Sequence, residues 1–397
     1  MKCYSTGKGT ISLWALLGIW SVSALTSLPG LAISPISDRL EVIFTGATEL
    51  DIELLTTLPS LLIIPFILLA GYISERIGYI KLLYIGLSLF LLSGALYFLC
   101  VTINELIVVS ALLGVGAGII IPLSTSLVSR FFAGKQRTRQ FGYVSAITNI
   151  ALVVATSVTG WLADIEWRLP FVVYLLPFFS LLLVPEIKRC GRGIEDDSDN
   201  SSGSSGGVNY ILLLKYMLYY FFITYLVMAV SLNLPFLLGG YGDDSAVVGV
   251  VTSLFFLAMM LPGLFINRII TFVGSSRVLV VSLLLIGVGL LGIFFSRSLL
   301  FVVAYCAVAG FGYGVAQPYI YDATATLAPS GKSTNLFALI MTMNYVAIVV
   351  APFVIDLAQK VLNEKGNAFP FVFNAILAFI GVVFLVVIRK RKISGDL

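Results

Sequence analysis

Apolar stretches of about 20 residues recur along this chain, and short polar connections separate them. The hydrocarbon core of a bilayer is about 30 Å thick, so one helix of roughly that length crosses it once. The 397 residues are 59% hydrophobic and only 11% charged, with a mean hydropathy of +1.04. A single water-soluble core would leave much of this apolar surface in water. The sequence therefore predicts an all-α integral membrane protein.

The positions of the apolar stretches predict twelve transmembrane helices. An even number of spans places both ends of the chain on the same side of the membrane. The expected ranges are 10–34, 49–73, 80–101, 105–129, 139–163, 168–187, 211–239, 246–270, 277–296, 299–324, 335–361 and 370–389.

Basic residues predict the orientation of these spans, because cytoplasmic connections are enriched in lysine and arginine. With a cytoplasmic N-terminus, the only ones of the 24 basic residues that fall outside are Arg39, Arg168, Arg297, Lys360 and Lys365. We therefore expect both termini to be cytoplasmic. The expected location is a bacterial inner (plasma) membrane. The net charge of +4 then indicates topology, not nucleic-acid binding. A cleaved signal peptide is the alternative interpretation of the N-terminus, where two lysines precede an apolar run.

Side chains for metal or disulfide chemistry are sparse in this sequence. There is no histidine, and the four cysteines, at positions 3, 100, 190 and 306, have no paired spacing. Neither a zinc site nor a disulfide framework is predicted, and no cofactor is expected. Without a metal or nucleophile cluster, an integral-membrane enzyme is disfavoured. Proton chemistry would have to use carboxylates, because histidine is absent.

One hydrophilic segment, 188–210, is rich in Gly, Ser and acidic residues and is predicted to be a flexible cytoplasmic linker. It separates an N-terminal six-helix bundle, 1–187, from a C-terminal six-helix bundle, 211–397. The two halves resemble each other: GVGAGIIIP at 114–122 aligns with GFGYGVAQP at 310–318. Two similar bundles that rock about a shared site are the design of many secondary transporters.

The segment GYISERIGYIKLL, 71–83, resembles the signature between the second and third helices of the major facilitator superfamily. The matching residues are Gly71, Glu75, Arg76, Gly78 and Lys81. EWRLPF at 166–171 is similar to the family's entry into helix six, and RQFGYVSAITN at 139–149 most resembles the drug-efflux antiporter branch. The resemblance implies two pseudo-symmetric six-helix bundles and transport by alternating access. Two departures, Ser110 and ATSVTG at 155–160, fall where proton-coupled exporters of the family carry other residues.

The five signature residues are predicted to form a conformational latch. Gly71 and Gly78 allow a tight turn, and the basic residues keep it in the cytoplasm. Glu75 is expected to reach the N-terminus of the eleventh span near Ser333, Thr334 and Asn335, where free amide groups favour an anion. The alternative is that these charges are solvated turn residues.

Two carboxylates, Asp322 and Asp356, are the candidates for proton coupling, because ionisable groups at membrane depth are costly and are often functional. For Asp322 a salt bridge at the rim of the membrane is an equal alternative. Asp356 can pair with Lys360 four residues later. The acidic residues at 49–53 are expected to cap a helix, with Thr48 and Asp51 at the spacing of a capping box.

The family resemblance implies a substrate site at the membrane midplane between the two bundles. The candidate substrate-binding residues are Trp20, Ser23, Ser27, Ser124, Asn149, Tyr225, Gln317, Asn344 and Tyr345. They offer aromatic faces and hydrogen-bonding groups but no charge, which favours a neutral or weakly charged amphipathic molecule over an anion that needs paired arginines. Helix packing or backbone hydrogen bonding is the alternative role for each of them.

The predicted function is secondary active transport by alternating access, with export of small amphipathic organic compounds. The alternative is a uniporter or importer of a neutral metabolite without proton coupling, which the two departures favour. The expected partners are a small-molecule substrate, the lipid bilayer and, if transport is coupled, protons. A monomer is expected, with no nucleic acid and no metal.

Overall fold

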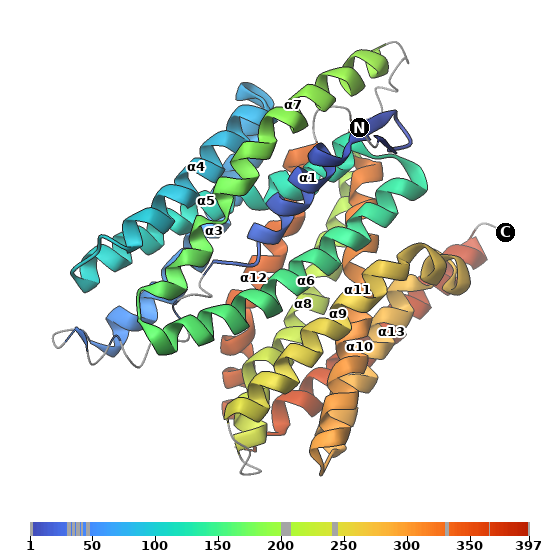
Figure 1. Ribbon diagram of the computed structural model, residues 1–397. Helices are drawn as coiled ribbons and strands as arrows, with labels where there is room; N and C mark the ends of the chain where they lie inside the picture. Colours follow the sequence, from blue (N-terminus) through green and yellow to red (C-terminus); the bar gives the residue numbers. More distant parts are fainter. Residues whose placement is uncertain are drawn as a thin grey trace. The chain divides into compact units, whose positions relative to one another are not determined.

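A computed structural model describes residues 3–29, 48–199, 208–239, 245–329, 333–364 and 366–395, with isolated residues at 33, 36, 40, 43 and 44. Nearly all of this part of the chain is helical (Figure 1). The elements are β1 (Cys3–Ser5), β2 (Thr10–Ser12), α1 (Leu13–Leu25), α3 (Glu49–Ile77), α4 (Tyr79–Tyr97), α5 (Ile103–Phe131), α6 (Gly134–Ile165), the 3-10 helix η2 (Leu169–Leu175), α7 (Pro177–Asp199), α8 (Tyr210–Gly239), α9 (Ser245–Val273), α10 (Val278–Phe295), α11 (Leu299–Leu327), α12 (Ser333–Leu362) and α13 (Phe369–Gly395).

Within the described residues, 11 helices are long and apolar enough to cross a membrane, and α1 is a shorter apolar helix. Many large apolar side chains on these helices are exposed, such as Leu61 and Phe353. Hydrocarbon cannot hydrogen-bond to the backbone, so each spanning segment must satisfy its own polar groups as a helix. The predicted all-α membrane fold is confirmed.

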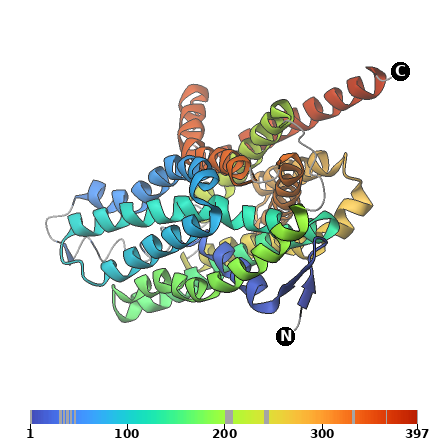
Figure 2. The same ribbon diagram turned by 90° about the horizontal axis from the view of Figure 1, so that it is seen from above.

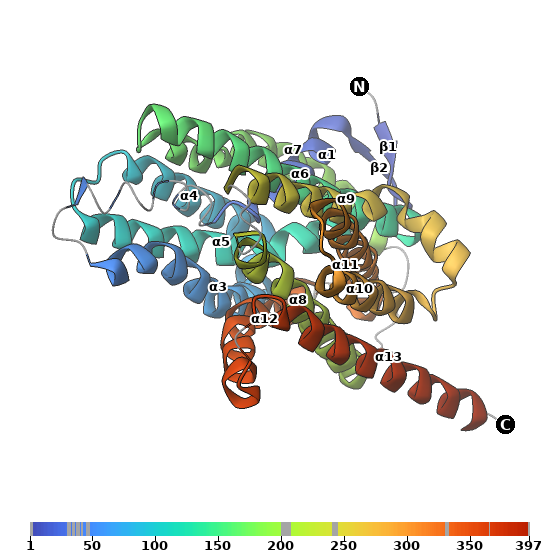
Figure 3. The ribbon, with the colours of Figure 1, turned by 90° about the horizontal axis from the view of Figure 1, so that it is seen from below.

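Several predicted boundaries differ from the structure by a few residues, and two spans differ more. The first span was expected over 10–34, but Thr10–Ser12 form a strand that pairs with Cys3–Ser5, and the helix runs from Leu13 to Leu25. Figure 3 shows this small hairpin at the start of α1. The sixth span was expected to end at 187, whereas α7 continues to Asp199, into the segment predicted as linker. The central part of that linker, 200–207, lies outside the described residues.

The chain forms two compact units that cut across the predicted halves. The first unit comprises Met1–Leu214 and Tyr321–Tyr345, and the second comprises Lys215–Ile320 and Val346–Leu397. The end of α11 and the beginning of α12 therefore pack with the N-terminal helices. The division at the linker, with bundles over 1–187 and 211–397, stays a prediction from the sequence repeat.

Glycines bring α5 against its neighbours in the first unit, where α3, α5 and α4 lie side by side (Figure 1). A Cβ on Gly114 would lie 2.6 Å from the Pro59 carbonyl oxygen of α3. A Cβ on Gly116 would lie 2.8 Å from the Phe90 amide nitrogen of α4. Such small residues let helix backbones approach closely.

The aligned glycines do the same in the second unit. A Cβ on Gly310 would lie 2.8 Å from the Phe255 carbonyl oxygen of α9, and one on Gly312 would lie 2.7 Å from the Ser282 carbonyl oxygen of α10. Thus α11 meets α9 and α10 through the same motif by which α5 meets α3 and α4. Here the sequence repeat is also a repeat of packing.

Capping residues fix where two long helices begin. The Thr48 side chain accepts a hydrogen bond from the Asp51 amide, and the Asp51 carboxylate accepts one from the Thr48 amide, which confirms the predicted capping box of α3. This hydrogen bond from the Thr48 backbone is the main cause of a lowered pKa at Asp51. Thr102 and Glu105 form the same box at the start of α5. The side chains of Glu49 and Glu53 lie outside the described part of the chain.

We expect Gly114→Ala to destabilise the protein, because its methyl group would collide with the backbone of α3. Overpacking of this kind costs about 1–3 kcal/mol. Gly160→Ala in α6 is the matched control, since nothing lies within 4 Å of a Cβ there. The control should be neutral or stabilising by up to about 1 kcal/mol from helix propensity. Thermal unfolding in detergent measures both, and equal midpoints for the two variants would contradict the packing described here.

Candidate functional site

An ion pair joins the two sequence halves within the first unit. The Arg137 Nε in the first turn of α6 donates to Asp322 Oδ1 of α11 at 2.7 Å. The Thr138 hydroxyl donates to the second carboxylate oxygen at 2.8 Å. The two charged side chains are only 14% and 23% exposed. A partly buried, charge-assisted contact of this kind is stronger than a solvent-exposed ion pair.

This geometry realises the rim salt bridge that the sequence left open for Asp322. Arg137 and Thr138 were not predicted as site residues. Arg137 was only one of the many basic residues expected on the cytoplasmic side. Its partner lies 185 residues away along the chain, so no local pattern pointed to the pair.

A second polar contact lies at the neighbouring ends of α5 and α12. The Thr334 hydroxyl donates to Ser126 Oγ at 3.1 Å, and both side chains are buried. Arg130 Nη2 donates to Thr334 Oγ1 at 3.4 Å, while its guanidinium carbon lies 4.5 Å from the centre of the Tyr79 ring. The first turn of α12 is therefore held by hydroxyl and guanidinium groups of α5.

The predicted latch residues lie close to this contact, but their interactions differ from the expectation. A Cβ on Gly71 would lie only 2.6 Å from Ala338 Cβ and 3.2 Å from Asn335 Cα, so α3 does approach the beginning of α12 closely. Glu75 is exposed, and no hydrogen bond joins it to α12 among the described residues. At this helix start the polar contacts to Thr334 come from Ser126 and Arg130 of α5.

The remaining signature residues shape the turn between α3 and α4. Gly78 has φ +85°, a conformation that side chains rarely adopt, and it separates the two helices. The Arg76 guanidinium donates to the Tyr72 hydroxyl and lies 4.4 Å from the centre of that ring. Lys81 is exposed. A latch made by these five residues stays a prediction.

Asp356, the second predicted carboxylate, pairs with Lys360. The Lys360 Nζ donates to Asp356 Oδ2 at 2.7 Å, as the spacing of four residues on α12 indicated. The two side chains are 60% and 71% exposed, so this pair is a surface contact of small energetic value.

Most substrate-binding candidates of the first unit bond within their own helix. Trp20 is the exception, because its Nε1 donates to Gln140 Oε1 of α6 at 3.0 Å and its ring lies edge-on to Tyr143. The others bond to carbonyl oxygens three or four residues earlier: Ser23 to Ile19, Ser27 to Ala24, Ser124 to Ile121 and Asn149 to Ser145. Asn344 and Tyr345 of α12 are half-buried.

The second unit gathers an aromatic cluster around Gln317. Its Nε2 donates to the Tyr220 hydroxyl at 3.3 Å. The Tyr220 and Tyr313 rings are stacked with centroids 6.4 Å apart, and the Thr224 and Tyr313 hydroxyls are 3.4 Å apart. Tyr225, on α8 like Tyr220, has a buried hydroxyl with no hydrogen-bond partner in the described part of the chain. Of these residues only Gln317 and Tyr225 were predicted; Tyr313 had been interpreted as part of a glycine motif.

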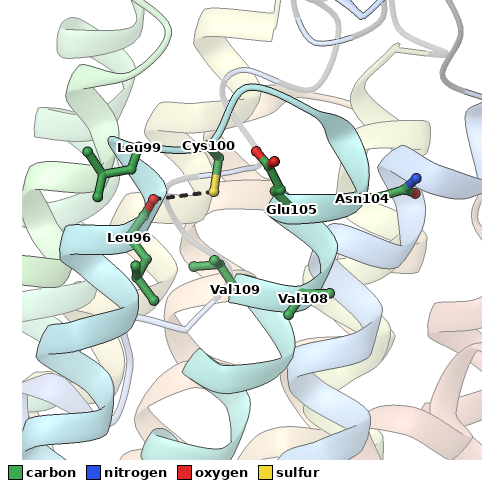
Figure 4. A pocket seen from close by; sticks show the side chains of 7 residues that line it. All are labelled: Leu96, Leu99, Cys100, Asn104, Glu105, Val108 and Val109. Atoms are coloured by element: carbon green, nitrogen blue, oxygen red, sulfur yellow. Dashed lines mark hydrogen bonds between the residues drawn. The ribbon is translucent and has the colours of Figure 1, made fainter.

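A surface cavity of about 380 Å³ lies where α4 ends and α5 begins (Figure 4). It contains none of the predicted site residues. The cavity is mostly apolar, and the Cys100 Sγ in it donates to the Leu96 carbonyl oxygen at 3.3 Å. The Glu105 carboxylate at its edge caps the start of α5. We interpret this hollow as part of the junction between the two helices. Its lining consists of Leu96, Leu99, Cys100, Asn104, Glu105, Val108 and Val109.

Long apolar helices that pack closely through glycines define a helical membrane protein. The family model described as Major Facilitator Superfamily matches residues 14–189 and 212–396. The chain belongs to this superfamily and is a transporter, not an enzyme.

Curated relatives match only parts of the chain. Multidrug transporter protein MdtP of Bacillus subtilis (strain 168) is 32% identical over 108 residues, which is 27% of this chain and 19% of that protein. Quinolone resistance protein NorA of Staphylococcus aureus (strain Mu50 / ATCC 700699) is 29% identical over 152 residues, 36% of this chain and 38% of that protein. The matched segments therefore span from about a fifth to about two fifths of these relatives.

Two solved structures share the fold over almost the whole length. The proton:xylose symporter XylE bound to 6-bromo-6-deoxy-D-glucose has a TM-score of 0.72 at 14% identity, covering 94% of both chains. The human organic anion transporter MFSD10 (TETRAN) has a TM-score of 0.73 at 16% identity, covering 94% of this chain and 98% of that one.

A double-mutant cycle should detect a strong coupling between Arg137 and Asp322. We expect a coupling free energy of about 1–3 kcal/mol between Arg137→Gln and Asp322→Asn, because each single change leaves a partly buried charge without its partner. The exposed pair is the matched control: Asp356→Asn with Lys360→Met should give no more than about 1 kcal/mol. Unfolding free energies in detergent provide the measurement. A coupling no larger at the first pair than at the second would contradict the structure.

Proposed function

We propose that this transporter works by alternating access and exports small amphipathic organic compounds. The observation that carries the proposal is the polar contact between the two sequence repeats. Asp322 and Thr334 belong to the second repeat, and in the first unit they are held by side chains of α5 and α6. Two repeats that rock against each other need contacts that exist in one state and open in the other.

The chemistry of this contact suits such a cycle. It consists of one ion pair and a few hydroxyl hydrogen bonds, each worth on the order of 1–3 kcal/mol, and water can satisfy the same groups once they separate. Water cannot replace the glycine-mediated packing among α3, α4 and α5 in this way, because that packing consists of apolar and backbone contacts. Opening would therefore separate the polar ends while leaving the helix packing of each repeat intact.

The proposed substrate class follows from uncharged polar and aromatic side chains among the binding candidates and their neighbours. Trp20, Gln317 and the stacked pair of Tyr220 and Tyr313 offer aromatic faces next to amide and hydroxyl groups. Such groups bind amphipathic molecules with an apolar body and few polar atoms. The names of the matched relatives, a multidrug transporter and a quinolone resistance protein, support export.

Proton coupling is proposed at Asp322. A proton on this carboxylate would remove one charge of the pair with Arg137, so proton binding would favour opening of the contact. Asp356 stays the reserve candidate, although its pair with Lys360 gives it no comparable link between repeats.

The alternative is uniport or import of a neutral metabolite without protons. This alternative is supported by Ser110, which stands where proton-coupled exporters of the family carry an arginine. Here Ser110 is buried, and its hydroxyl lies 2.6 Å from the Tyr97 hydroxyl.

A plasma-membrane location with both termini cytoplasmic is part of either proposal. Impermeant labelling of cysteines introduced into the segment 200–207 tests that orientation, and labelling from outside the cell would contradict it.

Transport into reconstituted vesicles tests the function. With a panel of amphipathic cations, neutral drugs and sugars, we expect an amphipathic compound to accumulate against its gradient only when a pH gradient is imposed. Asp322→Asn should abolish this accumulation but keep exchange at equal pH, and Asp356→Asn should keep both. Accumulation indifferent to the pH gradient would favour the uniport alternative. Full gradient-driven transport by Asp322→Asn would remove Asp322 from proton coupling.

A further inference from the structure

The N-terminal hairpin, residues 3–12, packs on the connection between α5 and α6. Its strands pair in the register Cys3 with Ser12 and Ser5 with Thr10, and the turn between them contains Gly7 at φ +80°. Figure 2 shows the hairpin as the dark blue strands beside the N-terminus. The Thr6 hydroxyl donates to the Gly9 carbonyl oxygen at 3.1 Å, and Thr6 is completely buried.

The tip of the hairpin bonds directly to the helix connection. The Thr6 carbonyl oxygen accepts a hydrogen bond from the Ala133 amide at 2.9 Å. A Cβ on Gly7 would lie 2.9 Å from the Ala133 carbonyl oxygen, so only glycine fits at this point of the turn. Ala133 is the residue that immediately precedes α6 and accepts the Arg137 amide.

Lys8 caps the last turn of α5. Its Nζ donates to the Ser129 carbonyl oxygen at 3.2 Å and to the Arg130 carbonyl oxygen at 3.0 Å. A cation is favoured at the C-terminus of a helix, where carbonyl groups lack partners within the helix. Burial, followed by the charges of Arg137 and Arg130, lowers the pKa of Lys8. Lys8 therefore lies close to both arginines that bind the segment 321–345.

We infer that the N-terminal hairpin is a positioning element for the contact between the two repeats. The hairpin fixes Ala133 and the end of α5, which sets the first turn of α6. Arg137 and Thr138 in that turn then meet the Asp322 carboxylate, and Arg130 at the end of α5 meets Thr334. Lys8 is the central positioning residue, because its ammonium group ties the hairpin to α5 beside both arginines.

The inference rests on the proposed alternating access for its consequence in transport, but the contact itself can be measured without a substrate. In a protein whose native cysteines are replaced, Ser126→Cys places a thiol next to the Thr334 hydroxyl. Its rate of reaction with a maleimide then reports how often α12 separates from α5. The labelling rate does not depend on transport. It therefore tests the role of the hairpin even if the proposed transport mechanism is wrong.

Lys8→Met should raise the labelling rate by roughly tenfold, the factor expected from loss of a charge-assisted hydrogen bond. Lys8→Arg should restore most of the protection. Lys188→Met is the matched control, because Lys188 is exposed on α7, and it should leave the rate unchanged. Gly7→Val, which pushes the turn away from Ala133, should raise the rate as Lys8→Met does.

Combination with the ion pair distinguishes positioning from general stability. If the hairpin acts through the contacts of Arg137 with Asp322 and of Arg130 with Thr334, adding Lys8→Met to the double variant Asp322→Asn with Arg130→Gln should raise the rate little beyond that double variant. Rates that multiply would show that the hairpin only stabilises the helix ends, and an unchanged rate in Lys8→Met and Gly7→Val would equally overturn the inference. Size-exclusion profiles and unfolding midpoints identify any variant that fails to fold. If either Lys8→Met or Gly7→Val does not fold, the labelling rate of the other variant tests the inference.

Discussion

A single carboxylate, Asp322, connects segments of the chain that lie 185 residues apart. It accepts one hydrogen bond from the Arg137 guanidinium and another from the Thr138 hydroxyl, and the pair is shielded from most of the solvent. In such surroundings a charge is costly without its partner and well stabilised with it. The contact between Arg137 and Asp322 is therefore strong while both charges are present. It weakens when the charge on Asp322 is removed or when α6 and α11 move apart.

Rigid and separable contacts are built from different residues in this molecule. The helices pack through glycines, as Gly114 does against α3 and Gly310 does against α9, and this packing recurs in both repeats. The contact between repeats uses Ser126, Arg137 and Thr334, whose groups water can also bind. Transport by two rocking bundles needs both kinds, because each bundle must stay intact while the surface between the repeats changes.

Local patterns in the sequence predicted the parts of the fold that depend on local physics. Apolar length indicated the spans, Thr48 and Asp51 indicated a helix start, and the aligned glycine motifs indicated that the two halves of the chain are repeats. The hairpin was missed because its turn, STGKG, was considered only for its charge and its first strand was too short for a periodic signal. The pairing of Arg137 with Asp322 and the stacking of Tyr220 on Tyr313 depend on which helices meet, and one sequence without tertiary contacts does not contain that information.

The proposed alternating access requires one event, the separation of α12 from α5 during each transport cycle. The Ser126 and Thr334 oxygens lie 3.1 Å apart, so two cysteines in their place are close enough for a disulfide with small adjustment. In a protein without its native cysteines, Ser126→Cys with Thr334→Cys should transport when reduced, stop when oxidised and recover on reduction, while each single variant ignores the oxidant. If the cross-linked protein transports at the rate of the reduced one, this contact does not open in the cycle and the account is wrong.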